Sequence, residues 1–180
     1  MPDLAGEKIA YLSFCGTIDS ASVSKIANTL NNALIALYDK VYLCISSNGG
    51  YVGDGIFLYN HIKGLHIPVI THNTGTVASI ATSIFVAGTT RYCTSNSIFM
   101  IHPVAMPSGR STSALESALD AARCDEARIE NILKDRTRLP EEILLSRRSR
   151  DIYLTPQQAL DHGLVAEIKD FSLPAGNQIF

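Results

Sequence analysis

The sequence predicts an α/β fold with a largely parallel sheet, and three observations support this prediction. Short runs rich in β-branched and aromatic residues alternate with segments whose apolar residues recur at helical spacing. One of these runs, Val41–Ser46, is almost continuously apolar, as expected of a strand covered on both faces. The length of 180 residues suits one domain, 1–180, and no internal repeat or low-complexity linker divides it.

The N-terminal part is predicted to form strand, helix, strand and helix. Ile9–Gly16 is a short run of β-forming residues that ends in glycine. The helix after it is capped by Asp19 or Ser20, and its predicted apolar face consists of Val23, Ile26, Ala27, Leu30, Leu34 and Leu37. After Val41–Ser46, the sequence Ser47-Asn48-Gly49-Gly50 predicts a turn. A second helix then runs through Ile56, Tyr59 and Ile62 and ends at Gly64.

The central part predicts three strands and one short helix. Val69–His72 is the first of these strands, and Arg91–Cys93 and Ile98–Ile101 are the other two. Between them, Ser79–Ala87 is apolar throughout and ends at Gly88, which indicates a buried helix.

The C-terminal part opens with a long helix, roughly from Ser111 to Arg138, with one side formed by Leu115, Leu119, Ala122, Ile129 and Leu133. Pro140 opens another helix, and Asp151–Leu154 is a short extended segment. A capping box from Thr155 to Gln158 begins the last helix, which Gly163 ends. Val165–Ile168 is the last predicted strand, and we expect the final dozen residues to form a loose tail.

Composition excludes several classes of protein. Hydrophobic residues make up 46% of the chain and charged residues 18%, so disorder is excluded as the dominant state. The net charge of −2 and the pI near 6.2 argue against nucleic acid as a partner. No apolar run reaches the roughly 18–20 residues of a membrane span, and no signal peptide is evident, so we expect a cytoplasmic protein. The cysteines and histidines lack metal-ligand spacing, and no metal or other cofactor is expected.

Two predicted loops carry residues that suit chemistry. In the first, the paired glycines Gly49 and Gly50 either form a tight turn or let a ligand approach bare backbone N–H groups. In the second, Ser79 stands where a strand and loop give way to an apolar helix. Ser79 either caps that helix or acts as a nucleophile beside unpaired N–H groups, and the residue pattern alone favours the cap.

A nucleophilic serine requires a base, and the base requires an acceptor that orients it. His102 ends the strand Ile98–Ile101 and is a candidate base, although a structural histidine is the commoner occupant of such a position. His61, His66 and His72 compete for the same role. Asp151 is a candidate acceptor. An aspartate that follows Arg147, Arg148 and Arg150 commonly pairs with such arginines instead. The basic run itself is a weak candidate for a phosphate site. Spacing alone selects none of these residues.

Four motifs in this order resemble the proteolytic subunit of the Clp protease, within the ClpP/crotonase superfamily. Ser46-Ser47-Asn48-Gly49-Gly50 resembles N-S-P-G-G, and Gly75-Thr76-Val77-Ala78-Ser79-Ile80-Ala81 resembles G-x-A-A-S-M-G. Met100-Ile101-His102-Pro103 resembles M-I-H-Q-P, and Arg150-Asp151-Ile152-Tyr153-Leu154-Thr155 resembles R-D-x-[FY]-[ML]-[ST]. The similarity extends from about Ile9 to Ile168 and implies a ClpP/crotonase-like fold of repeated ββα units with a protruding handle helix.

The resemblance implies a serine endopeptidase that hydrolyses peptide bonds. Ser79 would be the nucleophile, His102 the base and Asp151 the third member of the triad. The backbone N–H groups of Gly49 and Ile80 would form the oxyanion hole. Substrate would bind at Gly50, Pro103 and Val104, with the polar segment 103–109 as an extended edge for a peptide strand.

The resemblance also implies assembly into heptameric rings around a chamber, with a tetradecamer of two rings joined through the handle region, 103–139. Residues 1–8 would form a short N-terminal arm and 169–180 a tail. The family has a longer N-terminal segment that carries the loops meeting an AAA+ unfoldase, so the resemblance supports an unfoldase partner less directly than it supports peptide or unfolded-protein substrates. Asn48 in place of the motif's proline, and Ser149 in place of an acidic residue at ring contacts, are further departures.

Three other interpretations stay open on the sequence alone. A non-catalytic ring subunit would keep the fold, but such subunits usually lack members of the triad. A crotonase-like enzyme acting on acyl-CoA would use related backbone loops without the Ser, His and Asp set. A relative of signal-peptide peptidase A would use a Ser–Lys dyad, and no lysine lies near the candidate motifs.

Overall fold

A mostly parallel sheet forms the centre of the computed structural model, which describes residues 7–105 and 111–179. Its main path runs in the order β1 (Ile9–Cys15), β2 (Lys40–Ser47), β3 (Val69–Ala78), β4 (Thr90–Cys93) and β7 (Glu167–Ile168). β5 (Ile98–Ile101) pairs with β3 and with β6 (Ile152–Leu154). Every pairing is parallel except that of β5 with β6. The predicted α/β class with a parallel sheet is therefore confirmed.

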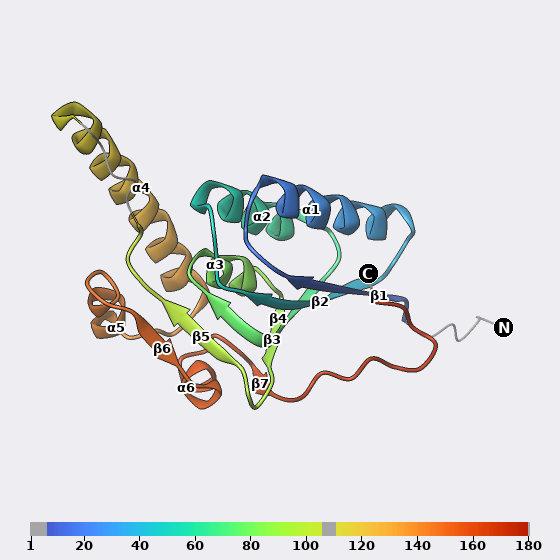
Figure 1. Cartoon of the computed structure of the whole chain (residues 1–180). Coiled ribbons are helices and arrows are strands. Elements are labelled where there is room, and N and C mark those ends of the chain that lie inside the picture. The colour runs from blue at the N-terminus through green and yellow to red at the C-terminus, as the bar shows by residue number, and fades with distance from the viewer. Residues whose placement is uncertain (1–6, 106–110, 180) are drawn as a thin grey trace.

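The helices surround the sheet in the way that the alternating pattern requires. α1 (Ser20–Ile35) and α2 (Val52–Gly64) lie over one face, and α3 (Ile80–Val86) packs between α2 and β3 (Figure 1). α5 (Glu141–Ser146) and α6 (Pro156–Asp161) lie beside β6, toward the other end of the sheet (Figure 1). All seven residues of α3 are buried, because this helix is covered on every side.

β3 is much longer than the predicted strand Val69–His72, because it continues through a polar stretch that reads as a loop. Its first half pairs with β4, and its second half, Thr76–Ala78, pairs with β5. Side chains hold the irregular segment between the two halves. Asn73 donates to the carbonyl of Ile98 at 2.9 Å and accepts from the N–H of Gly75 at 3.0 Å. The extended β3 carries Ser79 to the edge of the sheet.

Side-chain caps fix the N-terminal ends of α1 and α6. Asp19 caps α1 through a reciprocal pair of bonds with Ser22, and Thr155 and Gln158 form the predicted box at α6. The predicted apolar face of α1 is wrong at Leu37, which lies beyond the helix with a φ of 55° and is 81% exposed. The helix ends before it, with Ala36 as its C-cap.

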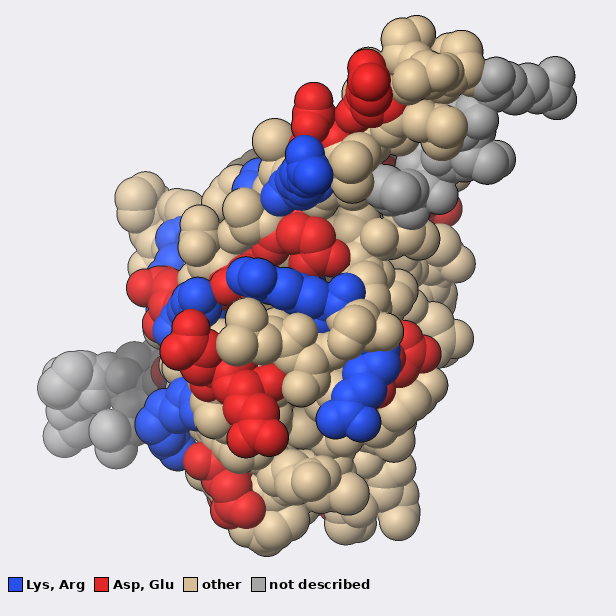
Figure 2. Space-filling model, turned by 90° about the vertical axis from the view of Figure 1, so that its left-hand side faces the viewer, with Lys and Arg blue, Asp and Glu red and all other residues tan. Residues whose placement is uncertain are grey.

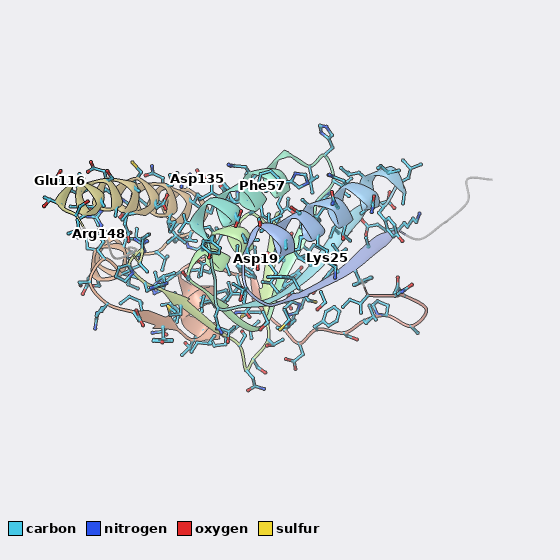
Figure 3. The ribbon with its side chains drawn as sticks, turned by 45° about the horizontal axis from the view of Figure 1, so that its top comes forward. Asp19, Lys25, Phe57, Glu116, Asp135 and Arg148 are labelled. Atoms are coloured by element: carbon cyan, nitrogen blue, oxygen red, sulfur yellow. The ribbon has the colours of Figure 1, made fainter. Side chains whose placement is uncertain are left out.

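α4 (Thr112–Arg136) projects from the body of the molecule as a single long helix (Figure 1). Glu116 lies near its free tip and Asp135 near its base (Figure 3). Ile129 and Leu133 are buried at the base, whereas Leu115 and Leu119 toward the tip are 49% and 39% exposed. The predicted apolar side of this helix is therefore packed only along its C-terminal half within one chain.

Charges on the side of the molecule that carries α4 are mixed in sign. Acidic and basic side chains alternate over this face without a large patch of either charge (Figure 2). In the described ranges 7–105 and 111–179, no helix is both long and apolar enough to cross a membrane.

The segment after Ile168, which we expect to form a loose tail, has no helix or strand over 169–178 but contacts the sheet at a few points. Phe171 packs its ring against Tyr11 and Tyr42, with ring centroids 6.4 and 5.5 Å apart. The carbonyl of Lys169 lies 2.9 Å from the Nε2 atom of His72, and Ile179 forms a parallel bridge with Tyr11. The chain thus returns across the sheet to β1 (Figure 1).

Candidate active site

Three neighbouring strands bring the candidate residues together at one edge of the sheet. Gly49 follows β2, Ser79 follows β3 and His102 follows β5, and these strands run parallel to one another. Because the carboxyl ends of parallel strands share an edge, residues far apart in the chain meet there. The pairing of Ala78 with Met100 places Ser79 beside the end of β5, where the N–H of Ser79 donates to the carbonyl of Met100 at 2.8 Å.

Ser79 and His102 are in direct contact. The Oγ atom of Ser79 lies 2.7 Å from the Nε2 atom of His102, which is the length of a good hydrogen bond. When Nε2 is the unprotonated nitrogen, the hydroxyl donates to it, and the histidine is placed to remove that proton. The Nδ1 atom then carries the ring proton and requires an acceptor of its own.

The backbone of Ser79 is held in an uncommon conformation. Its φ is 57° and its ψ −133°, a region that residues other than glycine seldom occupy. Ser79 stands at the N-cap of α3, but its side chain makes no capping bond. Its carbonyl instead accepts two bonds from Thr82, one from the N–H at 3.0 Å and one from Oγ1 at 2.6 Å. The capping role that the residue pattern favoured is therefore wrong, and the strain is of the kind that gathers at functional sites.

The turn after β2 touches the serine directly. Gly49 has a φ of 99°, and a Cβ atom built on it would lie 2.5 Å from the Cβ of Ser79. Its N–H donates to the Oγ of Ser47 at 3.1 Å. At Gly50 an added Cβ would lie 2.0 Å from the carbonyl oxygen of Ile18. A side chain at either position would clash with a neighbour, so both residues must be glycine. The turn that they form packs against Ser79 on one side and Ile18 on the other.

Ile80 supplies the first N–H group of α3, next to the candidate nucleophile. The first four N–H groups of a helix have no partner within it, so this group is oriented toward the end of the helix at which Ser79 lies. The Ile80 side chain is 1% exposed and anchors this end of α3 in the core. The first N–H of α3 and the turn that carries Gly49 thus both lie beside Ser79.

Asp151 is near His102 along the sheet but is not bonded to it. The antiparallel register pairs Met100 with Tyr153 and Ile101 with Ile152. One further step would place Asp151 opposite His102, with both side chains on the same face. Asp151 is exposed, and across residues 7–105 and 111–179 no hydrogen bond or ion pair joins it to His102. The structure brings the first two candidate triad residues together, whereas the third lies just beyond the last observed pair of β5 with β6 and makes no bond to His102.

The competing histidines have other surroundings. His72 is fully buried, with Nδ1 2.7 Å from the hydroxyl of Tyr42 and Nε2 bonded to the carbonyl of Lys169. Burial lowers the pKa of His72, which favours its neutral form. His61 lies on α2 with its ring stacked on Phe57, and His66 lies in the turn after that helix. Of the histidines, His102 is the one whose ring contacts Ser79.

A cavity of about 470 Å³ opens beside the serine. Pro103, Val104 and Gly50, the predicted substrate-binding residues, are among its lining residues, as are Ser79 and His102. Residues 106–109 of the expected substrate edge lie outside the described residues. The N–H of Val104 donates to the Oε1 atom of Glu126 on α4, so this donor is already used.

The arginines before Asp151 pair with glutamates of α4, which the sequence did not predict. Arg147 Nη1 donates to Glu126 at 2.7 Å, and Arg148 donates to Glu130 through two nitrogens at 3.0 and 2.7 Å. Arg148 lies below α4 in Figure 3. The expected pairing of Asp151 with arginines is absent from the described part of the chain, and two arginines of the candidate phosphate site are neutralised. No local pattern could reveal these pairs, because about twenty residues separate their members.

Outside residues 1–6, 106–110 and 180, no three His, Cys, Asp or Glu side chains gather in a way that could hold an ion. All four cysteines are free, with Cys44 and Cys93 buried and Cys15 and Cys124 exposed.

Comparison with known proteins gives consistent results. The model of the family described as Clp protease matches residues 9–171. An ATP-dependent Clp protease proteolytic subunit of Paracoccus denitrificans is 30% identical over 132 residues, covering 72% of this chain and 66% of the relative. A subunit of the same name from Oenothera elata subsp. hookeri is 29% identical over 153 residues, covering 80% and 61%. The chain thus spans less than two thirds of the length of these relatives.

A solved structure of a ClpP1 mutant from Listeria monocytogenes has the same overall fold. It covers 92% of both chains with a TM-score of 0.79 and 24% sequence identity. At this identity, the likeness shows the fold alone.

Proposed function

The chain belongs to the Clp protease family, and on this premise we propose that it is a serine endopeptidase subunit with Ser79 as nucleophile and His102 as general base. The observation that carries the proposal is the 2.7 Å contact between Ser79 Oγ and His102 Nε2. The backbone strengthens the argument from this contact. Ser79 adopts a strained conformation and does not cap α3, yet its hydroxyl keeps the contact with His102.

The proposed reaction is acyl transfer from a peptide bond to the serine and then to water. Ser79 Oγ attacks the carbonyl carbon while His102 Nε2 takes the hydroxyl proton, and His102 later returns that proton to the leaving amine. The N–H groups of Gly49 and Ile80 stabilise the oxyanion. For Gly49, this requires its N–H to exchange the Oγ of Ser47 for the substrate oxygen, or to share the two.

Asp151 is proposed as the acceptor that holds the Nδ1–H of His102. The register between β5 and β6 supports this role, because its extension by one pair beyond Ile101 and Ile152 would set Asp151 opposite His102. An exposed aspartate at that position reaches the ring by a rotation of its own side chain. Gly50, Pro103 and Val104 are proposed to bind the peptide, since all three line the cavity beside the serine.

We further propose that the subunit works in a homo-oligomeric ring that encloses a chamber and admits peptides or unfolded chains. α4 supports this part of the proposal, because Leu115 and Leu119 are exposed on a helix that projects beyond the body (Figure 1). A second copy of the chain would remove this apolar surface from water.

The experiment is a peptidase assay with internally quenched peptides of varied sequence. Wild-type protein is compared with Ser79→Ala, and Ser95→Ala serves as control because Ser95 is an exposed serine on the loop between β4 and β5. We expect cleavage by the wild type and the control and none by Ser79→Ala. A folded wild type without activity in any oligomeric state would contradict the proposal and favour a non-catalytic ring subunit.

A further inference from the structure

Arg147 is a buried cation in the wall of the cavity that contains Ser79 and His102. Its side chain is 1% exposed. One nitrogen, Nη1, donates to the Oε2 atom of Glu126 at 2.7 Å. The other two, Nε and Nη2, are also buried and have no hydrogen-bond partner among the described residues.

The two unpartnered nitrogens are adjacent on the guanidinium group. Nε and Nη2 share one edge of the planar group, where their N–H bonds point in parallel. This edge matches the two oxygens of a carboxylate, which it binds through two parallel hydrogen bonds. The ion pair with Glu126 uses a different nitrogen, so it does not occupy this edge.

A buried donor without a partner destabilises a fold, and natural proteins keep few of them. The cost is larger for Arg147 than for a neutral group, because burial removes its charge from water. Burial also lowers the pKa of its guanidinium group. Glu126 balances the charge but satisfies only one of the three guanidinium nitrogens, Nη1, and its other oxygen accepts the N–H of Val104. A second carboxylate that reached this edge, through a shift of the groups that now cover it, would satisfy both donors at once.

Among the described lining residues, the cavity offers such a carboxylate no second Lys or Arg. Arg147 is the one Lys or Arg among the lining residues that the structure describes. Several of the others are apolar, namely Val52, Ile101, Pro103, Val104 and Ile129. Asp125 also lines the cavity, but its carboxylate is paired with Arg128. The cavity is therefore a mostly apolar space with one cation, open to the serine.

We propose that Arg147 binds the acidic side chain, Glu or Asp, of the substrate residue whose carbonyl Ser79 attacks. The inference rests on the proposed function, and it adds the class of substrate. The side chain next to the attacked carbonyl is the one placed to enter a cavity that adjoins the serine. A volume of about 470 Å³ accommodates a glutamate side chain.

Binding to the full-length Ser79→Ala chain tests the inference apart from catalysis. Calorimetric titration would compare acetyl-Ala-Ala-Glu-Ala-Ala-amide with the peptide that has Gln in place of Glu, which has the same shape and no charge. We expect the Glu peptide to bind about tenfold or more tightly, as two charge-assisted bonds imply. A third peptide, acetyl-Ala-Ala-Gln with a free C-terminal carboxylate, separates side-chain from terminal recognition.

Variants then assign the effect to one arginine. In the Ser79→Ala chain, Arg147→Met is expected to abolish the preference for Glu over Gln, whereas Arg148→Met, at the exposed neighbour, is expected to retain it. If Arg147→Met fails to fold, the double change Glu126→Gln with Arg147→Met removes both partners of the buried pair and serves instead.

Equal binding of the Glu and Gln peptides would overturn the inference, and so would a preference that survives the loss of Arg147. Tight binding of the terminal carboxylate alone would also overturn it, because it would assign Arg147 to the end of a peptide. The proposed function is tested separately, by cleavage with the wild-type chain, so the two failures are distinguishable.

Discussion

Gly49 lies against Ser79 so closely that a Cβ atom on Gly49 would be 2.5 Å from the Cβ and 3.1 Å from the Oγ of the serine. The φ of 99° at Gly49 also disfavours any residue with a side chain. The turn after β2 can therefore pack against the start of α3 only because Gly49 has no side chain.

Gly49→Ala is expected to reduce kcat/KM for peptide cleavage by at least ~10²-fold, the usual effect of losing one oxyanion donor. The added methyl group would displace either the serine or the Gly49 N–H. The control is Gly64→Ala at the end of α2, where an added Cβ meets nothing within 4 Å. Wild-type activity in Gly49→Ala would show that the turn plays no part in the reaction.

Asp151→Asn is expected to lower kcat by ~10³–10⁴-fold while the fold is retained, because an amide holds the wrong tautomer of the histidine. Steady-state kinetics with a quenched peptide would measure this. Asp161→Asn, on α6, is the matched control, since Asp161 is exposed and accepts from Gln157. A kcat near the wild-type value in Asp151→Asn would mean that another group orients His102.

The contact of Glu126 with Arg147 is expected to contribute to the stability of the fold. Glu126→Ala leaves the buried guanidinium without its one side-chain partner and should lower the free energy of unfolding by about 3 kcal/mol. Urea unfolding would measure the change. Asp120→Ala breaks an exposed pair with Arg123 on the same helix and should have a much smaller effect. Equal effects of the two changes would contradict this account of Arg147.

Stability should depend on pH through His72. Burial lowers the pKa of His72 in the folded protein, whereas an unfolded histidine has a pKa of about 6.5. The unfolded chain therefore binds a proton that the folded chain does not bind. Stability from this group is complete above pH ~6.5, decreases as the pH falls below that value, and levels off below the folded pKa.

The measurement for His72 is the urea midpoint at a series of pH values, for the wild type and for His72→Phe. Phenylalanine keeps the ring between Tyr42, Tyr92 and Phe171 but cannot titrate. The variant should lose less stability than the wild type between neutral and mildly acidic pH. The same loss in both proteins would show that His72 is not the titrating group.

The sequence predicted those parts of the fold that depend on local signals. Alternation of strands and helices predicted the sheet, and β5 was placed within its observed bounds, Ile98–Ile101. The second half of β3 was missed, because Asn73 and Gly75 look like a loop and are kept in the strand by side-chain bonds to other segments. Leu37 continues the apolar spacing of α1 but lies beyond the end of the helix and is exposed, because periodicity does not reveal where a helix ends.

The candidate site shows the same limit. Residue patterns favoured a cap at Ser79, and the family resemblance, rather than spacing, singled out Ser79 and His102. Their contact depends on the parallel pairing of β3 with β5. In the sequence, Arg147 looks like part of a basic surface run, but the fold buries it against Glu126 on another helix. Long-range pairings of this kind leave no trace in local sequence.

The central claim is that Ser79 is activated by His102, and mapping the site of a fluorophosphonate adduct by mass spectrometry tests it most directly. The account predicts an adduct on Ser79 of the folded wild-type protein, none in Ser79→Ala, and much slower labelling in His102→Ala. A folded wild-type protein that stays unlabelled, or that is labelled equally well after Ser79→Ala, would contradict it.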